Sequence, residues 1–126
     1  MGKWQRGVKP AGWYPHRGDV CLFRLDKERP ALVISTDALN RFSLDICVVP
    51  ISGKEHTQFS LRPKLKAGDA GLNRDSWAKC DQVTTVEKNS AVYPALGSLQ
   101  RELLTTIEEA IRIALELPER IGRSGS

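Results

Sequence analysis

The stretch "GSLQRELLTTIEEAIRIALEL" (97–117) decides the fold class of this chain, because it differs in kind from everything before it. Its apolar residues recur at spacings of three and four, which is the pattern of one face of an α-helix. These residues are Leu99, Leu103, Ile107, Ala110, Ile111, Ala114 and Leu115. The pattern predicts an amphipathic helix of about five turns, with Ser98 as its N-cap and Pro118 to stop it.

The residues before this helix favour short β-strands. Apolar and β-branched runs bounded by turn-forming residues predict strands at 19–25, 30–36, 44–52 and 57–63, and one or two strands at 76–87. Residues 37–42 predict one helical turn with Asp37 as a plausible cap, and residues 64–75 are expected to form a loop. Several strands followed by one long helix indicate an α+β domain, in which the helix closes one end or face of a mostly antiparallel sheet.

The charge of the chain is concentrated at its N-terminus. The 126 residues carry a formal net charge of +4, and residues 1–18 account for all of it, because they hold four basic residues and no acid. The other 108 residues carry 15 basic and 15 acidic side chains. An affinity for nucleic acid must therefore come from a local patch or from the N-terminal arm. The length suits one domain with a real hydrophobic core.

Three cysteines, Cys21, Cys47 and Cys80, lie far apart in strand-like surroundings. Their odd number and the lack of a CxxC pair argue against a disulfide framework and against a structural zinc site. They suit a reducing compartment. No apolar run approaches the length needed to cross a membrane, and no apolar segment follows the basic N-terminus as it would in a secretory signal. We therefore expect a cytoplasmic protein.

Residues 1–16 form a basic arm that lacks periodicity and contains several glycines and prolines, so we expect it to be extended and flexible. Trp4, Trp13 and Tyr14 are interleaved with its cations. Two interpretations are open for these rings. They could stack on nucleic-acid bases, or the arm could dock partly on the domain, and the second interpretation is favoured.

One segment of the strand-like region, "WAKCDQVTT" (77–85), carries Lys79 and Asp81 two positions apart. In a strand, such residues point to the same face, so the ammonium and the carboxylate would stand side by side. Two interpretations are again open. The two residues could form an ion pair on a solvated strand, which is common and contributes little to stability. Alternatively, they could be charged residues of a functional site.

The order of the motifs along the chain resembles that of the MazF/PemK family of toxin endoribonucleases. In chain order, the similar segments are "RGDVCLFRL", "RPALVIS" followed by "DALNRF", "VVPIS", "GLNRDSWAKCDQVTTVEK", and "LGSL" with the terminal helix. The resemblance extends from Arg17 to about Leu117. It makes 17–117 the expected toxin domain and leaves 1–16 as the arm and 118–126 as a tail.

The resemblance implies a compact, strongly curved SH3-like β-barrel with helices, working as a homodimer. It also implies sequence-specific cleavage of single-stranded RNA, including mRNA, without a metal or another cofactor, which inhibits translation and growth. A cognate antitoxin protein of a type II toxin–antitoxin system would hold this activity in check.

The resemblance also assigns catalytic residues. Arg29, before the proline of the second strand, stands where the family has the arginine that acts at the scissile phosphate. Ser52 closes the "PIS" strand and keeps the family's hydroxyl group without its methyl group. Lys79 and Asp81 occupy the catalytic basic and acidic positions of the PemK branch, with lysine in place of arginine. Under the resemblance, the charged pair therefore belongs to a site.

Cleavage of RNA without a metal requires that the 2′-hydroxyl attack its own phosphate, with a base, an acid, and cations that hold the negative charge. Arg29 suits the last role, because its planar guanidinium grips two phosphate oxygens and stays protonated. Ser52 can donate a hydrogen bond to a phosphate oxygen. Asp81 could act as the base, although Lys79 beside it would favour the anion and lower its basicity.

The expected site is completed by four substrate-binding residues, which are Arg17, Glu28, His56 and Gln82. The family's longer loop between the first two strands is missing, because "RLDKERP" turns almost at once. Glu28 would then take the acidic position of that loop. For His56, and for His16 in the arm, a solvated loop histidine is the favoured interpretation.

Two rival functions stay open on the sequence alone. The shortened first loop favours a non-catalytic barrel of the same family that binds RNA or an antitoxin. A gyrase-poisoning toxin with this fold is disfavoured, because that class acts through aromatic residues near its C-terminus and "PERIGRSGS" (118–126) contains none. The joint presence of the candidate catalytic residues favours the endoribonuclease.

Overall fold

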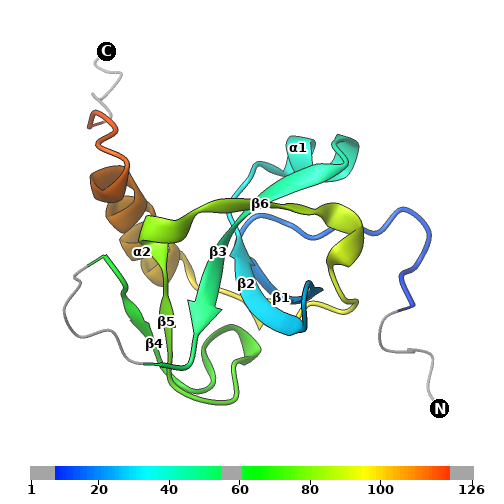
Figure 1. The fold of residues 1–126 in the computed structure, drawn as a ribbon, viewed down its shortest axis with the longest axis horizontal. Helices are drawn as coiled ribbons and strands as arrows, with labels where there is room; N and C mark the ends of the chain where they lie inside the picture. Colours follow the sequence, from blue (N-terminus) through cyan, green and yellow to red (C-terminus); the bar gives the residue numbers. More distant parts are fainter. Residues whose placement is uncertain (1–7, 55–60, 120–126) are drawn as a thin grey trace.

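Figure 1 shows the computed structural model of the chain, in which residues 8–54 and 61–119 are described. A curved sheet fills the centre of the view, with one long helix beside it and one short helix at the top. The strands are β1 (Asp19–Arg24), β2 (Glu28–Val33), β3 (Asp45–Ser52), β4 (Lys64–Leu65), β5 (Ser76–Ala78), β6 (Thr84–Glu87) and β7 (Gly97–Ser98). The helices are α1 (Asp37–Phe42) and α2 (Arg101–Ala114), and the 3₁₀ turns are η1 (Asp69–Gly71), η2 (Cys80–Gln82) and η3 (Lys88–Ser90).

The described strand pairings are all antiparallel and give the order β4-β5-β3-β2-β1-β7, with β6 also paired to β3. The first half of β3, residues 45–48, pairs with β6. Its last two residues, Ile51 and Ser52, pair with β5 instead. Because two strands pair with successive parts of β3, the sheet curls into a half-barrel (Figure 1). The predicted α+β class, with an SH3-like curved antiparallel sheet and a C-terminal helix, is confirmed.

Two apolar clusters form the core, because successive side chains of a strand alternate between its two faces. The first contains Val20, Leu32, Val49, Ile51, Leu65, Leu72, Ala78, Cys80, Leu99, Ile107 and Ala110. The second contains Cys21, Phe23, Ala31, Val33, Ile46, Val48 and Ala91. Neighbours such as Val20 and Cys21 in β1 belong to different clusters, and both are fully buried. The strands β1 and β2 are therefore buried on both faces, with α2 closing the first cluster.

α2 is shorter than the sequence predicts, and Ser98 is not its N-cap. Ser98 lies in β7, where its hydroxyl donates a hydrogen bond to Asp19 Oδ1 at 2.6 Å. Leu99 donates its backbone N–H to the carbonyl of Gly18 at 2.9 Å, so the chain stays extended here and the helix begins only after Gln100. The helix has 14 residues, which is about four turns.

The cap of α1 also differs from the prediction. The side chain of Thr36, not that of Asp37, accepts the backbone N–H of Leu39 at 3.3 Å. Asp37 Oδ1 accepts the backbone N–H of Arg17 instead, at 2.7 Å. The predicted helical turn is confirmed, and Asp37 in its first turn joins Arg17, two residues before β1, to the start of α1.

The run 76–87 is not one continuous strand, so the prediction that Lys79 and Asp81 share a strand face is wrong. β5 ends at Ala78, and η2 separates it from β6. Lys79 has φ −87° and ψ 76°, outside the strand region, while its N–H still donates to the carbonyl of Pro50 at 2.9 Å. The physical reason lies in the registers, because Ala78 pairs with Ile51 and Thr84 pairs with Val48. Five residues, 79–83, therefore lie opposite only two residues of β3, and the excess must leave the ladder as a turn.

The region after β3 departs from the prediction as well. Four residues of the expected strand 57–63 lie outside the described part of the chain, and the last three are not in a strand. β4 forms within the expected loop 64–75, where Lys64 and Leu65 pair with β5. A strand of two residues is too short to produce an alternating pattern in the sequence.

The described part of the arm, residues 8–16, docks on the domain. Lys9 Nζ donates to a backbone carbonyl of η3 at 2.8 Å. The ring of Trp13 meets that of Tyr93 edge-on, with the ring centroids 5.3 Å apart, and Trp13 also packs against the second apolar cluster. The favoured interpretation, partial docking, is confirmed for these residues, whereas Trp4 lies outside the described residues.

The three cysteines are free thiols. Cys21 and Cys80 are fully buried, and burial raises the pKa of each thiol to about 12. Both residues therefore act as small apolar members of the core, where thiolate chemistry is suppressed. Within the part of the chain that the structure describes, no helix is both long enough and apolar enough to cross a membrane.

A close backbone approach holds η1 against β7. Gly71 has a φ of +78°, and a Cβ at this position would collide with the backbone carbonyl of Leu96. Gly68, with a φ of +99°, has nothing within 4 Å of its Cβ position. A side chain at Gly68 would meet only the strain of a left-handed backbone, whereas a side chain at Gly71 would also collide with a neighbouring backbone.

Gly71→Ala is expected to lower the free energy of unfolding by about 3 kcal/mol, because left-handed strain adds to a displaced backbone. Gly68→Ala is the matched control and is expected to cost about 1 kcal/mol, because it meets the strain alone. Urea unfolding of both variants and of the wild type measures the difference. Equal losses for the two variants would contradict the close packing of η1 on β7.

Candidate functional site

A groove of about 760 Å³ is lined mainly by four parts of the fold. These are the β1–β2 hairpin, the second half of β3 with the two residues after it, the segment 71–76, and β6. Apolar side chains such as Leu22, Val48 and Leu72 form part of the lining. The curl of the sheet around β3 brings these distant segments to one site.

The groove is basic. Among the described residues that line it, one side chain is acidic, that of Glu28, and five are basic: Lys27, Arg29, Lys54, Arg74 and Lys79. The chain beyond residue 18 carries equal numbers of basic and acidic residues, so the excess of basic residues in the groove is a local concentration of positive charge. A concave surface that collects one sign of charge attracts polyanions such as nucleic acids.

Arg29 lies near the start of β2, opposite Phe23 of β1. Its Nε and Nη2 donate to the two carboxylate oxygens of Asp26 at the hairpin tip, each at 2.9 Å. Both side chains are about half exposed or more. These hydrogen bonds from Arg29 hold the pKa of Asp26 well below its usual range, so Asp26 is an anion at neutral pH.

Ser52 ends β3 at the edge of the groove, and its hydroxyl shapes the turn that follows. Its Oγ accepts the backbone N–H of Lys54 at 3.1 Å. The guanidinium of Arg74 lies against the same turn and donates to the carbonyl of Gly53 at 3.2 Å. A Cβ at Gly53 would collide with this guanidinium, so glycine is what permits the approach. The turn thus gathers a hydroxyl and two cations.

Lys79 and Asp81 have different surroundings. Lys79 lines the groove from the junction between β5 and η2. Asp81 does not line it and accepts two hydrogen bonds from Arg62, through Nε at 2.8 Å and Nη2 at 2.9 Å. The Arg62 side chain is only 8% exposed. These hydrogen bonds from Arg62 hold the pKa of Asp81 below its usual range.

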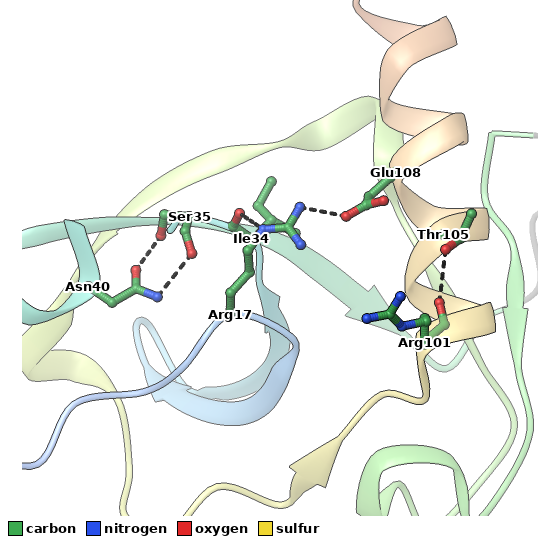
Figure 2. Close-up of polar contacts among 7 residues, drawn as sticks. All are labelled: Arg17, Ile34, Ser35, Asn40, Arg101, Thr105 and Glu108. Atoms are coloured by element: carbon green, nitrogen blue, oxygen red, sulfur yellow. Dashed lines mark hydrogen bonds and ion pairs between the residues drawn. The ribbon is translucent and has the colours of Figure 1, made fainter. Parts of the chain in front are cut away.

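Arg17 does not line the groove and instead joins the end of β2 to α2 (Figure 2). Its Nε donates to the carbonyl of Ile34 at 2.9 Å, and its Nη2 lies 2.8 Å from the carboxylate of Glu108. Beside it, the fully buried Asn40 donates through Nδ2 to the carbonyl of Ser35 at 3.0 Å. The contacts of Arg17 connect the sheet to α2 and therefore support the fold. The role of Arg17 in substrate binding stays a prediction.

The structure therefore divides the eight predicted site residues. The groove brings together four of them, which are Glu28, Arg29, Ser52 and Lys79. Three do not line it, which are Arg17, Asp81 and Gln82. His56 lies outside the described residues, and His16 stacks on the ring of Tyr14 with the centroids 4.6 Å apart, away from the groove lining.

Sequence reasoning missed three groove cations, Lys27, Lys54 and Arg74. Lys27 lies in the charged segment "DKER" (26–29), and nothing in that segment distinguishes it from an ordinary solvated turn residue. Lys54 and Arg74 lie on connecting segments without periodicity, and only the close approach of Arg74 to Gly53 places them together. The one local signal for Lys54 is the turn-forming Gly53, which follows the hydroxyl residue Ser52 at the end of β3.

The arrangement can bind a chain of phosphates and polarise one of them. Guanidinium and ammonium groups supply positive charge, and the Ser52 hydroxyl supplies a donor beside them. Among residues 8–54 and 61–119, no group of three or more His, Cys, Asp or Glu side chains is placed to hold a metal ion.

Comparison with known proteins identifies the family of this chain. The family described as PemK-like, MazF-like toxin of type II toxin–antitoxin system matches residues 16–115. The chain is 30% identical over 90 residues to "Endoribonuclease EndoA" of Bacillus subtilis (strain 168), which covers 71% of this chain and 77% of that protein. It is 26% identical over 119 residues to "Endoribonuclease MazF9" of Mycobacterium tuberculosis, which covers 90% of this chain and 92% of that protein.

The fold is shared with solved structures. One of them, "Endoribonuclease in complex with its cognate antitoxin from Mycobacterial species", superposes with a TM-score of 0.74 at 25% identity and covers 84% of this chain and 99% of that chain. The matched region contains the curled sheet, the groove and α2. The chain therefore belongs to the family of PemK-like, MazF-like toxins of type II toxin–antitoxin systems.

Proposed function

We propose that this chain is a sequence-specific endoribonuclease toxin that cleaves single-stranded RNA, including mRNA, without a metal, and so inhibits translation and growth. The observation that carries the proposal is the basic groove, in which Arg29 and Lys79 line the same surface as the hydroxyl of Ser52. The relatives named above, EndoA and MazF9, are endoribonucleases.

Arg29 and Ser52 hold the scissile phosphate. As the 2′-hydroxyl attacks phosphorus, negative charge gathers on the non-bridging oxygens, and preorganised donors stabilise this charge most when they are aimed at it. A guanidinium binds two such oxygens at once and stays protonated throughout. The Ser52 hydroxyl donates to one oxygen, and the ammonium of Lys79 adds a further positive charge.

The remaining groove cations bind flanking phosphates. Lys54 and Arg74 lie at the turn after β3, and Lys27 lies at the tip of the hairpin. Each phosphate contact releases a counterion, so the affinity for RNA falls as the salt concentration rises. A single strand fits this site better than a duplex, because its backbone can follow a short curved groove.

The proton of the 2′-hydroxyl needs an acceptor. Asp81 is held as an anion by Arg62, which lowers its pKa and weakens it as a base, and it does not line the groove. Glu28 is the one carboxylate among the described lining residues, and its ion pair with Arg24, at 3.8 Å, is longer than the two hydrogen bonds between Arg62 and Asp81. We therefore assign proton acceptance to Glu28 and assign to Asp81 the support of η2, the turn that follows Lys79. The sequence-based assignment of Asp81 as the base is the alternative that the variants below decide.

The partners follow from the same family. We propose that a cognate antitoxin binds this chain, because a relative of the same fold is solved in such a complex. We also propose a homodimer, because α2 and the segment after it expose Ile113, Leu115 and Leu117 by about half each. We also propose that the protein acts in the cytoplasm, and its free cysteines and the proposed RNA substrate support this.

A second candidate function is binding without cleavage, in which the groove holds RNA or an antitoxin segment. The observation that favours it is the short β1–β2 hairpin, whose tip consists of Leu25, Asp26 and Lys27. The cleavage assays below separate the two functions, because a binding module retains its affinity for RNA and leaves the strand intact.

Arg29→Ala is expected to reduce the cleavage of a long single-stranded RNA in EDTA about a thousandfold, because the main donor to the developing charge is lost. Arg29→Lys is expected to restore part of the rate, because a point charge cannot reproduce a two-oxygen grip. Single-turnover rates of the three proteins measure this, with circular dichroism as the control for folding. Wild-type cleavage by the alanine variant would remove Arg29 from the site.

Glu28→Gln is expected to slow cleavage about a hundredfold with little change in RNA affinity, because it removes the proton acceptor and keeps the shape. Asp81→Asn is the matched comparison and is expected to slow cleavage by no more than about threefold, because Asp81 acts only through η2. Its main effect is a loss of about 2 kcal/mol of stability, since Arg62 loses a charged partner. The reverse pattern of rates would assign the base to Asp81.

The protein is expected to sediment as a dimer at micromolar concentration, because a small half-barrel that exposes an apolar helix end gains by burying it. Analytical ultracentrifugation of the full chain at moderate salt checks this. A single species of 14.0 kDa, the mass of one chain, would contradict the proposed homodimer.

A further inference from the structure

The tip of the β1–β2 hairpin is short and holds one carboxylate against Arg29. The backbone N–H of Leu25 donates to the carbonyl of Lys27 at 3.1 Å, which closes the turn. Asp26 lies inside this turn and accepts from Arg29 Nε and Nη2, each at 2.9 Å. The carboxylate is therefore attached to a closed turn at one end and to the guanidinium at the other.

Asp26 occupies only one edge of the guanidinium. Of the five N–H groups of an arginine side chain, it takes the one on Nε and one on Nη2. Two N–H groups on Nη1 and the second on Nη2 have no acceptor among the described residues. These groups form a second fork, which can bind two oxygens of one phosphate. Arg29 lines the groove, so the second fork belongs to a residue of the site.

Stability does not explain this pair. The side chains of Asp26 and Arg29 are 68% and 49% exposed. Exposed ion pairs contribute little to stability, because water screens them and ordering two side chains costs entropy. What the pair does supply is a fixed orientation for a long side chain that would otherwise sample many rotamers.

We infer that Asp26 is a positioning residue for RNA cleavage: it holds one edge of the Arg29 guanidinium and thereby aims the other edge at the scissile phosphate. The inference rests on the proposed function. It gives the short hairpin a part in the site, since Asp26 lies three residues before Arg29 within one tight turn.

The opposite effect is also physically possible, and this makes the inference testable. A carboxylate beside a phosphate-binding arginine repels the phosphate, so charge repulsion alone predicts that removing Asp26 strengthens RNA binding and speeds cleavage. Positioning predicts slower cleavage even at saturating protein, because a misaligned donor stabilises the transition state less.

The test is the single-turnover cleavage of a long single-stranded RNA by Asp26→Asn at saturating protein. We expect a rate about tenfold below that of the wild type, because asparagine cannot accept both N–H groups. In the Arg29→Lys background, the same change is expected to alter the rate by less than about twofold, because lysine has no second edge to aim. A purely structural role for Asp26 would slow cleavage equally in both backgrounds.

Glu109→Gln is the matched control. Glu109 and Arg112 form the same three-residue arrangement on α2, with Nε and Nη2 donating at 3.0 Å and 2.7 Å. Neither residue lines the groove. This variant removes one exposed carboxylate from an arginine without touching Arg29, so its cleavage rate is expected to equal that of the wild type.

Three outcomes overturn the inference. They are faster cleavage by Asp26→Asn, equal slowing in the wild-type and Arg29→Lys backgrounds, and equal slowing by Glu109→Gln. If the wild type leaves RNA intact, the proposed function fails, and ¹⁵N relaxation of the Arg29 Nε–H then decides separately whether Asp26 orients the Arg29 guanidinium. Positioning predicts an ordered Nε–H in the wild type and a mobile one in Asp26→Asn, and equal mobility in both overturns it.

Discussion

The exchange of partners along one edge of β3 is the constraint on which the rest of the structure depends. Residues 45–48 pair with β6, and the last two residues pair with β5. Between these two pairings, the five residues 79–83 lie opposite only two residues of β3, so the excess must leave the ladder, and η2 makes this crossing. The crossing bends the sheet, closes the first apolar cluster through Cys80, and sets Lys79 beside the end of β3 through its hydrogen bond to Pro50.

The same curl explains how a chain with a neutral body presents a basic groove. Three of the five groove cations come from different parts of the fold, and each has a local contact: Arg29 with Asp26, Arg74 with the turn after Ser52, and Lys79 with Pro50 through its backbone. Most acids of the domain lie elsewhere, several of them paired on α2 or on the loop before β5. A positive surface of this kind attracts RNA without specifying sequence, so specificity must come from the apolar and polar side chains between the cations.

The sequence predicts the elements better than their ends, for physical reasons. The long apolar runs of β1 to β3 and the periodic α2 carry strong local patterns, whereas the break at 79–83 interrupts a run that is strand-like throughout. For the candidate site, the order of the motifs singles out Arg29, Ser52 and Lys79, and all three line the groove. The partner of Asp81 could not, because Arg62 lies 19 residues away and meets it only after the sheet has curled.

The chemistry of the RNA ends tests the account most directly. Attack by the 2′-hydroxyl breaks the bond to the 5′-oxygen, so one fragment ends in a 2′,3′-cyclic phosphate and the next begins with a 5′-hydroxyl. The measurement is mass spectrometry of the fragments that the wild-type protein produces from a long single-stranded RNA in the presence of EDTA. The account predicts cyclic phosphate and 5′-hydroxyl ends. Fragments that carry 5′-phosphates and 3′-hydroxyls would show that water is the nucleophile, and RNA that stays intact would show that the groove only binds; either result would contradict the account.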